Sequence, residues 1–447
     1  MPFNVVLGVH QFLPEFVAGT EILTYETARE LRRRGHDVTV LTGFPRRDGL
    51  GAAVSDCYVH EGIPVRRFFD QPKRPVDYDN APFAAELKTY LQARRPDVVH
   101  FFHFGRLSAS AIDVGDELNL PMVFTPTDFW LLCPLNHLRL PDGKSCSGPD
   151  SYSINCVRHF ASRTQPYLRH LFYRTPDRLL ARAIRRIERG ALGRFWFSSY
   201  VSALARRPSF LRERVGKLDR LIVPTRLVDR LLRQNGFPMD RATLVPYGIN
   251  VDGIRREQRS NDGRVLRVGF IGTLYEHKGA DVLIRAVRAL SRDCSLHVCV
   301  YGRTDESPRY FRRLRQLADG DERIEFCGTF PPAWLGDVMA SLDVLVVPSV
   351  WYENTPLVAY SAQAAACPIV ASNVPGLAEV VEHNENGLLF EPGDSRGLAA
   401  ALEQLVLQPG LLSRLSSGAP LPRPIGDYVT RLIDIYDEVI RERGRRR

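Results

Sequence analysis

Short apolar runs alternate with amphipathic stretches along this chain, and the alternation starts twice. Residues 5–9 form an uncharged, β-branched run that predicts a buried strand. Residues 21–34 carry apolar side chains on one side, which predicts a helix that Thr20 caps and Gly35 ends. Residues 38–41 predict the next strand, so these features together indicate a right-handed βαβ unit with parallel strands.

The same rhythm continues through the first half and restarts in the second. Further strands are expected at residues 97–101, 122–125, 221–224, 266–271, 295–300, 324–327, 344–347 and 369–371, and further helices at 281–290 and 356–366. Strands that alternate with helices in both halves predict an α/β protein with two doubly wound, Rossmann-like domains. We expect residues 221–224 to close the sheet of the first domain.

The expected domain boundaries follow from this rhythm. Residues 1–250 form the N-terminal domain, with a basic helical insert at about 130–217, and residues 262–424 form the C-terminal domain. The polar stretch 250–263 lacks an apolar period and is expected to link them. Residues 425–447 are expected to form a helix that packs back on the body and ends in a solvated basic tail.

Length and composition narrow the class of protein. A chain of 447 residues exceeds the roughly 250–300 residues that one core supports, so two domains are expected. Its 44% apolar and 25% charged residues exclude a disordered protein. No run approaches about 18 uncharged apolar residues, which argues against a transmembrane helix. The first ten residues lack the basic start of a secretory signal, and eight cysteines are too few for a disulfide scaffold. We therefore expect free thiols and a cytoplasmic location.

The net charge of +9 is concentrated in one segment. Residues 158–217 hold fifteen Lys or Arg and three acids, which leaves the rest of the chain slightly acidic. Such a segment suits anionic lipid, a phosphate-bearing substrate or nucleic acid. The stretch 178–187 places Leu and Ile on one helical face and arginines mostly on the other, and Phe195, Trp196, Phe197 and Tyr200 follow. We expect it to lie on an anionic membrane; a packed helix with a solvated basic face, or an acidic polysaccharide acceptor, remain alternatives.

Two loops could hold a diphosphate. Ligands of doubly wound folds bind where parallel strands end and helices begin. Residues 18–20 follow the first strand, and residues 272–279 follow the first strand of the second half. Their small residues let backbone amides approach an anion, and Lys278 adds a positive charge. The spacing is not that of a Walker loop, and ordinary turns are the alternative for each loop taken alone.

A third element lies after the predicted strand 344–347. Glu353, Asn354 and Thr355 occupy the junction between that strand and the next helix. A carboxylate at such a junction can accept hydrogen bonds from sugar hydroxyls. A helix cap formed by Asn354 or Thr355 is the alternative interpretation.

A cysteine-rich loop raises the question of a metal. Cys133, Cys146, Cys156 and His159 fall within a stretch rich in proline and glycine. A tetrahedral zinc bound by these four residues could order such a loop, which has little core of its own. Three ordinary thiols are the alternative.

These features together resemble the retaining glycosyltransferases of family 4, which have the GT-B fold. The resemblance covers nearly the whole chain. It is carried by residues 19–20 in place of a diglycine, 97–103, 127–134, 245–250, 270–274 with 278–279, 348–353, 387–390 and 393–394. Residues 127–134 resemble a branch of the family that assembles polysaccharides.

The resemblance implies two domains facing across a cleft and a metal-independent reaction. A nucleotide-diphosphate sugar would bind mostly to the C-terminal domain, and a polysaccharide or lipid-linked acceptor would dock on the N-terminal one. The sugar would be transferred with retention of configuration. The protein would be cytoplasmic and peripheral on the inner face of the membrane, with no nucleic-acid partner.

The resemblance also implies roles for individual residues. Lys278 and helix amides would stabilise the leaving diphosphate, while Glu353 would hold the sugar. His103 and Asp128 would face the sugar and acceptor from the other domain. The implied donor-binding residues are Gly19, Thr20, Gly272, Thr273, Gly302, Gly328, Thr329, Asn354, Thr355, Leu357 and Ser361. The Asp-x-Asp segments 77–79 and 319–321 match a metal pattern of the other transferase fold, and we interpret both as coincidental.

Three positions depart from the family pattern. Thr273 replaces a basic residue, Ser361 replaces a glutamate that binds ribose hydroxyls, and Thr127 replaces a histidine. Loss of one charge-assisted hydrogen bond costs roughly 1.5–3 kcal/mol, which would weaken donor binding. A weakly active or inactive relative that binds nucleotide sugars and supports another transferase is therefore the alternative function. A nucleic-acid binder is disfavoured because RNA-binding and zinc-finger motifs are lacking, and loop spacings fit transferases better than same-fold epimerases.

Overall fold

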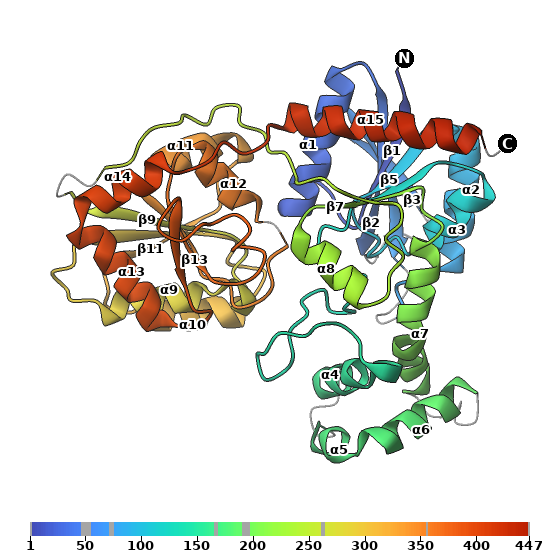
Figure 1. The fold of residues 1–447 in the computed structure, drawn as a ribbon, viewed down its shortest axis with the longest axis horizontal. Coiled ribbons are helices and arrows are strands. Elements are labelled where there is room, and N and C mark those ends of the chain that lie inside the picture. The colour runs from blue at the N-terminus through green and yellow to red at the C-terminus, as the bar shows by residue number, and fades with distance from the viewer. Residues whose placement is uncertain are drawn as a thin grey trace. The chain divides into compact units, whose positions relative to one another are not determined.

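The computed structural model describes residues 2–45, 55–70, 76–164, 169–189, 197–260, 264–354 and 356–445. The chain divides into two units. The first unit comprises residues 1–246 and 426–447, and the second comprises residues 247–425. Both expected α/β domains are present as parallel-sheet units, and each is described by itself below (Figure 1).

The first unit contains a sheet of eight strands in the described part of the chain. Their order is β3-β4-β2-β1-β5-β6-β7-β8, and all pairs are parallel except β3 with β4. The strands are β1 (Asn4–Val9), β2 (Asp37–Pro45), β3 (Ser55–His60), β4 (Ile63–Asp70), β5 (Val98–Phe101), β6 (Met122–Phe124), β7 (Arg220–Val223) and β8 (Ala242–Leu244). The expectation that residues 221–224 close the sheet is wrong, because the short, half-exposed β8 pairs outside β7.

The helices of the first unit include an inserted group. They are α1 (Gly19–Arg33), α2 (Ala81–Arg94), α3 (Ser110–Glu117), η1 (Ser151–Ser153), α4 (Ile154–Thr164), α5 (Arg169–Arg174), α6 (Asp177–Glu188), α7 (Ser198–Val215), α8 (Arg226–Gln234) and α15 (Ile425–Gly444). Figure 1 shows α4, α5 and α6 gathered beside α7, away from the sheet. The N-cap of α1 is Ala18 and not Thr20, because the chain becomes helical two residues earlier than the pattern predicts.

The C-terminal helix α15 packs on the first unit, as expected. Tyr428, Val429, Leu432 and Tyr436 are fully buried. The hydroxyl of Tyr436 lies 2.7 Å from Nδ1 of His100 on β5. The last helix of the sequence therefore completes the N-terminal unit.

The second unit contains an entirely parallel sheet of six described strands. Their order is β11-β10-β9-β12-β13-β14. The strands are β9 (Leu266–Ile271), β10 (Leu296–Tyr301), β11 (Ile324–Gly328), β12 (Val344–Val347), β13 (Ile369–Ser372) and β14 (Gly387–Phe390). The helices are η3 (Glu276–Lys278), α9 (Ala280–Ala289), α10 (Pro308–Ala318), η4 (Pro332–Trp334), α11 (Leu335–Ala340), α12 (Leu357–Ala364), α13 (Ser395–Leu407) and α14 (Pro409–Ser417).

The polar stretch expected as a linker packs on the second unit over its described residues. Arg256 donates hydrogen bonds to the carbonyls of Gln363 and Ala419. Arg259 is buried and donates to the carbonyl of Met339. Hydrogen bonds to backbone carbonyls hold this segment without an apolar period, which is why its pattern resembled a free linker.

Candidate active site

An ion pair lies at the carboxyl ends of two neighbouring strands of the second unit. Lys278 ends η3 in the loop between β9 and α9, and Glu353 lies in the loop between β12 and α12. Nζ of Lys278 is 2.7 Å from Oε1 of Glu353. The Glu353 side chain is 5% exposed, whereas that of Lys278 is 24% exposed. The Lys278 ammonium is therefore partly exposed to solvent, whereas the Glu353 carboxylate that it contacts is buried.

Backbone contacts explain why these two loops meet. Gly279 has φ +75°, and a Cβ at this position would lie 1.9 Å from the carbonyl oxygen of Pro348. The amide of Val350 donates to the carbonyl of His277 at 2.9 Å. Glycine is required at position 279 because only it combines this φ with so close an approach. The two loops are thus held together next to Lys278.

Two further donors converge on the same oxygen of Glu353. Ser349 Oγ and Trp351 Nε1 both donate to Oε1, the indole from 3.0 Å. The Trp351 ring also lies 5.2 Å from Nζ of Lys278, which is a cation–π distance. Sequence reasoning missed the roles of Ser349 and Trp351. The available signal was their position in the same motif, where Ser349 lies four residues and Trp351 two residues before Glu353.

Glycines occupy the ends of the neighbouring strands. The amide of Gly302 donates to the carbonyl of Gly328 at 2.7 Å, and a Cβ on Gly302 would lie 2.3 Å from the carbonyl oxygen of Gly272. Thr273 is half-buried and Thr329 is exposed beyond these glycines. Three predicted glycines thus lie together where β9, β10 and β11 end, with their backbones close-packed.

The other predicted donor-binding residues of this unit have mixed placements. Asn354 is buried, and its Nδ2 lies 3.4 Å from the hydroxyl of Tyr247. Leu357 begins α12 and is half-buried. Ser361 is buried, and its hydroxyl donates to the carbonyl of Leu357 within the same helix, so the structure does not bring it to the ion pair. Thr355 lies outside the described residues.

In the first unit, the structure brings His103 and Asp128 together. His103 Nε2 is 2.8 Å from Asp128 Oδ2, and the amide of Gly105 donates to His103 Nδ1. Because Nδ1 accepts a hydrogen bond from the amide of Gly105, Nε2 carries the hydrogen that faces Asp128. Burial would raise the pKa of Asp128, but His103 and the amide of Trp130 together hold it below its ordinary value. The carboxylate is therefore kept ionised.

Two residues extend this group that sequence reasoning did not identify. The His10 ring lies against that of His103, with ring centroids 4.1 Å apart and the two planes tilted by 36°. His10 Nε2 lies 3.4 Å from Oε1 of Glu21, which is fully buried on α1. Burial raises the pKa of Glu21 against the opposing effect of its backbone hydrogen bond. The predicted Gly19 and Thr20 form the first turn of α1, adjacent in sequence to this buried acid.

The two Asp-x-Asp segments have structural contacts. Asp77 accepts a hydrogen bond from the indole of Trp130, and Asp79 accepts one from Ser110. In the other segment, Asp321 pairs with Arg323 at 2.9 Å. These carboxylates hold neighbouring parts of the fold.

The four residues of the cysteine-rich loop line one cavity, but their ligand atoms do not form a metal-sized group. The Cys146 thiol donates to the carbonyl of Gly148, and Asn155 Nδ2 approaches its sulfur at 3.7 Å. Cys133, Cys156 and His159 line the same cavity. In the described part of the chain, the one group of three ligand atoms within 4.8 Å of each other lies elsewhere. Zinc binding by these four residues therefore stays a prediction.

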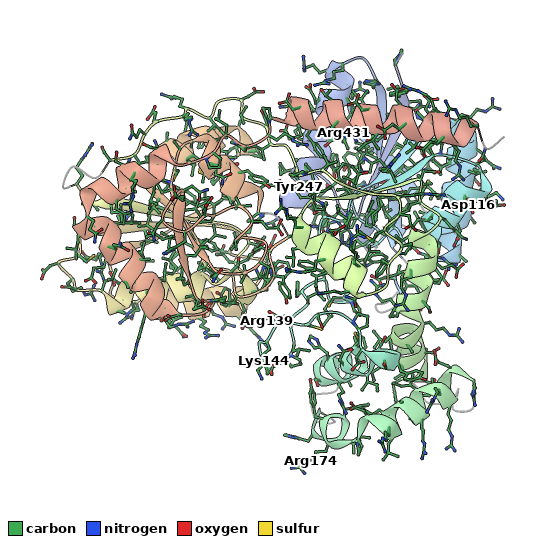
Figure 2. The ribbon with its side chains drawn as sticks, in the orientation of Figure 1. Asp116, Arg139, Lys144, Arg174, Tyr247 and Arg431 are labelled. Carbon is green, nitrogen blue, oxygen red and sulfur yellow. The ribbon has the colours of Figure 1, made fainter. Side chains whose placement is uncertain are left out.

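The basic segment differs from its expected arrangement. Leu180 and Ile184 of α6 are buried in a small core with residues of α4 and α7, so the apolar face predicted to meet a membrane packs internally. Phe195 and Trp196 lie outside the described residues. Arg178, Arg182 and Arg186 are exposed. Periodicity alone could not distinguish a membrane from a neighbouring helix. Figure 2 shows Arg174 at the end of α5, and Arg139 and Lys144 on the loop that follows β6.

Three side chains near this segment are apolar and exposed. They are Leu171 and Tyr173 on α5 and Leu179 on α6, with exposed fractions of 63%, 45% and 52%. They lie within a few residues of Arg174 and Arg178. No described helix is long and apolar enough to cross a bilayer.

Comparison with solved structures identifies the class of fold. Two parallel-sheet units with small residues and a lysine at the strand ends are the architecture of GT-B sugar transferases. A sucrose-phosphate synthase from Thermosynechococcus elongatus aligns with a TM-score of 0.67 and 16% identity, covering 98% of this chain and 99% of that one. HepE from Anabaena, solved in complex with UDP and glucose, aligns with a TM-score of 0.62 and 16% identity, covering 97% and 99%.

Sequence comparison then identifies the family. The model described as Glycosyltransferase Family 4 matches residues 17–252, and the one described as Glycosyl transferases group 1 matches residues 266–408. The chain belongs to glycosyltransferase family 4, and the family resemblance is confirmed. A D-inositol 3-phosphate glycosyltransferase from Rhodococcus jostii is 34% identical over 221 residues, which are 46% of this chain and 49% of that protein. The chain thus spans about half the length of this curated relative. A protein of the same name from Xylanimonas cellulosilytica is 30% identical over 252 residues, covering 52% and 60%.

Proposed function

We propose that this glycosyltransferase moves a sugar from a nucleotide-diphosphate sugar to a glycan or lipid-linked acceptor, with retention of configuration. The observation that carries the proposal is the ion pair of Lys278 with Glu353, which lies at the carboxyl ends of adjacent parallel strands. Ligands of doubly wound folds bind at these strand ends.

The donor would bind to the second unit. Charge develops on the diphosphate as the bond to the sugar breaks, and a fixed cation and backbone amides stabilise it most effectively where water is excluded. The proposal assigns this cation to Lys278 rather than to a metal ion. Glu353 holds the Lys278 ammonium in place and accepts hydrogen bonds from the hydroxyls of the sugar. The glycines at 272, 302 and 328 leave room for the nucleotide to approach the backbone.

UDP-sugars are the first donors to test. HepE is named in its solved structures with UDP, with UDP and glucose, and with UDP-glucose. The fold alone does not decide between nucleotides, so GDP- and ADP-sugars belong in the same panel. Thr273 and Ser361 lack the charged groups of the family pattern, which predicts weaker donor binding than in relatives that have them.

The acceptor would be held by the first unit near His103 and Asp128. The Asp128 carboxylate orients the imidazole, and the pair can bind an acceptor hydroxyl or the transferred sugar. The curated relatives are named for inositol 3-phosphate, a hydroxylated and phosphate-bearing acceptor. A phosphate-bearing acceptor would also suit the excess of arginine in residues 158–217.

The same basic segment supports a peripheral membrane contact. Leu171, Tyr173 and Leu179 are exposed beside arginines, which favours an anionic lipid surface over a purely electrostatic polymer contact. A lipid-linked acceptor would then be met at the membrane. The location proposed for the protein is the cytoplasmic face of that membrane.

Donor binding and turnover test the proposal together. The purified chain is screened by thermal shift against UDP-, GDP- and ADP-sugars, and a ligand at about 100 times its Kd should stabilise the fold by about 2.7 kcal/mol. The best donor is then incubated with inositol 3-phosphate and with lipid-linked glycans, and the anomeric configuration of the product is read by NMR. Added Mg²⁺ or Mn²⁺ should not stimulate turnover.

The outcomes separate the two candidate functions. Donor stabilisation with transfer and retention supports the enzyme. Stabilisation without turnover by any acceptor supports the weakly active relative. If no nucleotide sugar stabilises the chain, neither function stands.

A further inference from the structure

One face of the sheet in the second unit carries ligand-type side chains. Parallel strands are usually covered on both faces and contain continuous apolar runs. In β10, Leu296, Val298 and Val300 are buried in the core, but His297 and Cys299 alternate with them and are half-buried on the opposite face. This face of the strand therefore carries polar, metal-ligating side chains where the other face carries apolar ones.

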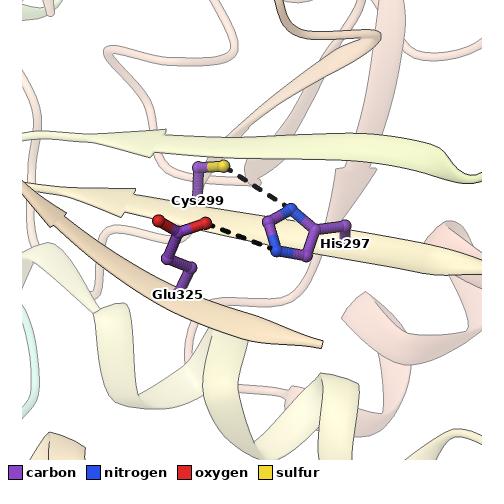
Figure 3. A group of neighbouring side chains, drawn as sticks. All are labelled: His297, Cys299 and Glu325. Atoms are coloured by element: carbon purple, nitrogen blue, oxygen red, sulfur yellow. Dashed lines mark hydrogen bonds and ion pairs between the residues drawn. The ribbon is translucent and has the colours of Figure 1, made fainter. Parts of the chain in front are cut away.

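The neighbouring strand adds a carboxylate to the same face. Cys299 pairs directly with Glu325 in the register of β10 and β11. His297 Nδ1 lies 3.7 Å from Cys299 Sγ, and His297 Nε2 lies 3.5 Å from Glu325 Oε2 (Figure 3). Ligand atoms of the three side chains all lie within 4.8 Å of one another. In the structure's described ranges, no other three such atoms are as close.

A second thiol reaches this group through an irregularity in β11. Val300 pairs with Phe326, but the next residue, Tyr301, pairs with Gly328, so Cys327 is the extra residue of a bulge. A bulge redirects the side chain that it inserts. The Cys327 thiol donates to the carbonyl of Glu325 at 3.8 Å, and it lies close enough to Cys299 to interact with it electrostatically. Burial, and then the neighbouring Cys299, raise the pKa of Cys327 to about 12.

We propose that His297, Cys299, Glu325 and Cys327 bind one Zn²⁺ ion on this face of the sheet. Zinc in structural sites takes four ligands in a tetrahedron, from cysteine sulfur at about 2.3 Å and from histidine nitrogen or carboxylate oxygen at about 2.0–2.2 Å. Neighbouring ligand atoms in such a tetrahedron are about 3.3–3.8 Å apart by geometry. Only one nitrogen of the His297 ring can bind the ion, so one of its two contacts, 3.7 Å or 3.5 Å, would become an edge of this tetrahedron. The ligand atoms of His297, Cys299 and Glu325 lie within 4.8 Å of one another, so the ion would draw them closer together.

The chemistry of the four groups selects the metal. Thiolate and imidazole ligands favour zinc and its transition-metal neighbours, whereas Mg²⁺ and Ca²⁺ prefer oxygen ligands alone. Binding removes the protons of both thiols, and the two thiolates balance the charge of Zn²⁺, so the Glu325 carboxylate leaves the site with one net negative charge. The site is thus structural and separate from Lys278 and Glu353.

The position in the sheet gives such an ion a mechanical role. Within the described strands, β11 lies at the edge of the sheet and pairs only with β10. Two of the four ligands lie on β10 and two on β11, so the metal would hold the edge strand in register. Cys327 directly precedes Gly328, whose carbonyl accepts from Gly302. Any effect of the metal on donor binding near Gly328 would depend on the proposed function. The metal site itself does not depend on it.

Metal content of matched cysteine variants tests the inference. The full chain, C299S/C327S and C146S/C156S are reduced, stripped of metal, equilibrated with ZnCl₂ and passed through gel filtration before elemental analysis. C146S/C156S is the matched control because it removes two thiols from the cysteine-rich loop. The wild type and this control should retain about one zinc per chain, and C299S/C327S should lose it.

Cobalt and a milder variant keep the test independent of folding. Co²⁺ should give a thiolate charge-transfer absorption in the wild type and in C146S/C156S but not in C299S/C327S. H297Q should retain the fold, because its side chain is half-exposed, and should weaken zinc binding by at least about tenfold. The inference is overturned if the wild type binds no zinc, if C299S/C327S keeps the wild-type amount, or if only C146S/C156S loses it. None of these readouts depends on sugar transfer.

Discussion

Nζ of Lys278 lies 2.7 Å from Oε1 of Glu353, and this contact joins two loops that are 75 residues apart in the sequence. The carboxylate is buried and accepts from two further donors, whereas the ammonium remains partly exposed. This asymmetry suits a fixed anion that presents a cation to a ligand.

Loss of either partner should impair transfer much more than folding. Lys278→Ala removes the cation that would face the diphosphate. Glu353→Gln removes the negative charge that positions the Lys278 ammonium, but it keeps an oxygen that can accept the hydrogen bond from Ser349. Each variant should lower kcat/KM with the preferred donor by about 10²–10³, as expected for one lost electrostatic contact in an active site.

An exposed ion pair provides the control for these variants. Lys88 pairs with Glu117 in the first unit, where both side chains are largely exposed. Such pairs contribute about 0–1 kcal/mol, so Lys88→Ala should leave activity unchanged. Wild-type turnover by both Lys278→Ala and Glu353→Gln would disprove the assignment of the site.

The backbone behind Glu353 should be as sensitive as the side chain. A Cβ on Gly376 would lie 1.6 Å from the carbonyl oxygen of Glu353, so Gly376→Ala must displace that residue. We expect the second unit to lose about 1–3 kcal/mol of stability and the chain to lose donor binding.

A second glycine serves as the matched control. Gly410 lies in α14, and a Cβ there would meet no atom within 4 Å. Gly410→Ala should therefore be neutral or stabilising by up to about 1 kcal/mol. Differential scanning calorimetry with and without donor measures both effects. Equal behaviour of the two variants would show that the loop carrying Glu353 tolerates displacement.

The sequence allowed correct prediction of those features that depend on local pattern. The buried strands that precede Lys278 and Glu353 are short apolar runs, and the family motifs then placed both residues at strand ends. Trp351 was missed although it lies two residues before Glu353 in the same motif. His10 was missed because its contacts with His103 and Glu21 join separate elements. The half-exposed β8 lacked an apolar run. The apolar face of α6 was visible, but its partner, the insert core on α4 and α7, was not.

A defect at Asp128 should separate transfer from donor binding. Asp128 accepts from His103 and from the amide of Trp130 in the first unit, whereas the proposed donor contacts lie in the second. Asp128→Asn keeps an oxygen for Trp130 but no longer fixes the imidazole by charge. Transfer should fall by about 10²-fold or more, with the thermal shift caused by the donor unchanged. A parallel loss of donor-induced stabilisation would contradict this division of roles.

The buried contact of His100 with Tyr436 should make the first unit sensitive to acid. Burial lowers the pKa of His100 to about 3, whereas an unfolded histidine titrates near its ordinary 6.5. Below about pH 6.5 the unfolded chain binds a proton that the folded chain excludes, so the free energy of unfolding falls as the pH drops toward 3. The fall can reach roughly 5 kcal/mol over this window.

Tryptophan fluorescence can follow this unit alone. In a W334F/W351F background the remaining tryptophans, Trp130 and Trp196, belong to the first unit. Urea midpoints measured between pH 4 and 7 should drop with pH, and His100→Gln should flatten that dependence. An unchanged slope in His100→Gln would assign the acid sensitivity to other groups.

Vesicle binding tests the exposed surface of α5 and α6. Arg178, Arg182 and Arg186 are exposed, whereas Arg185 lies over the Tyr152 ring and is left intact in the test. R178E/R182E/R186E should abolish sedimentation with anionic vesicles at low salt, since each basic residue near such a surface contributes about 1 kcal/mol. R309E/R312E/R315E on α10 makes the same change of charge in the second unit and should bind normally.

Leu171→Asp should also weaken binding because it removes an exposed apolar side chain beside these arginines. If the wild type prefers anionic vesicles no more than neutral ones, or if both triple variants lose binding equally, the membrane contact through α5 and α6 is wrong. The arginines would then serve an acidic acceptor or only solvate the insert.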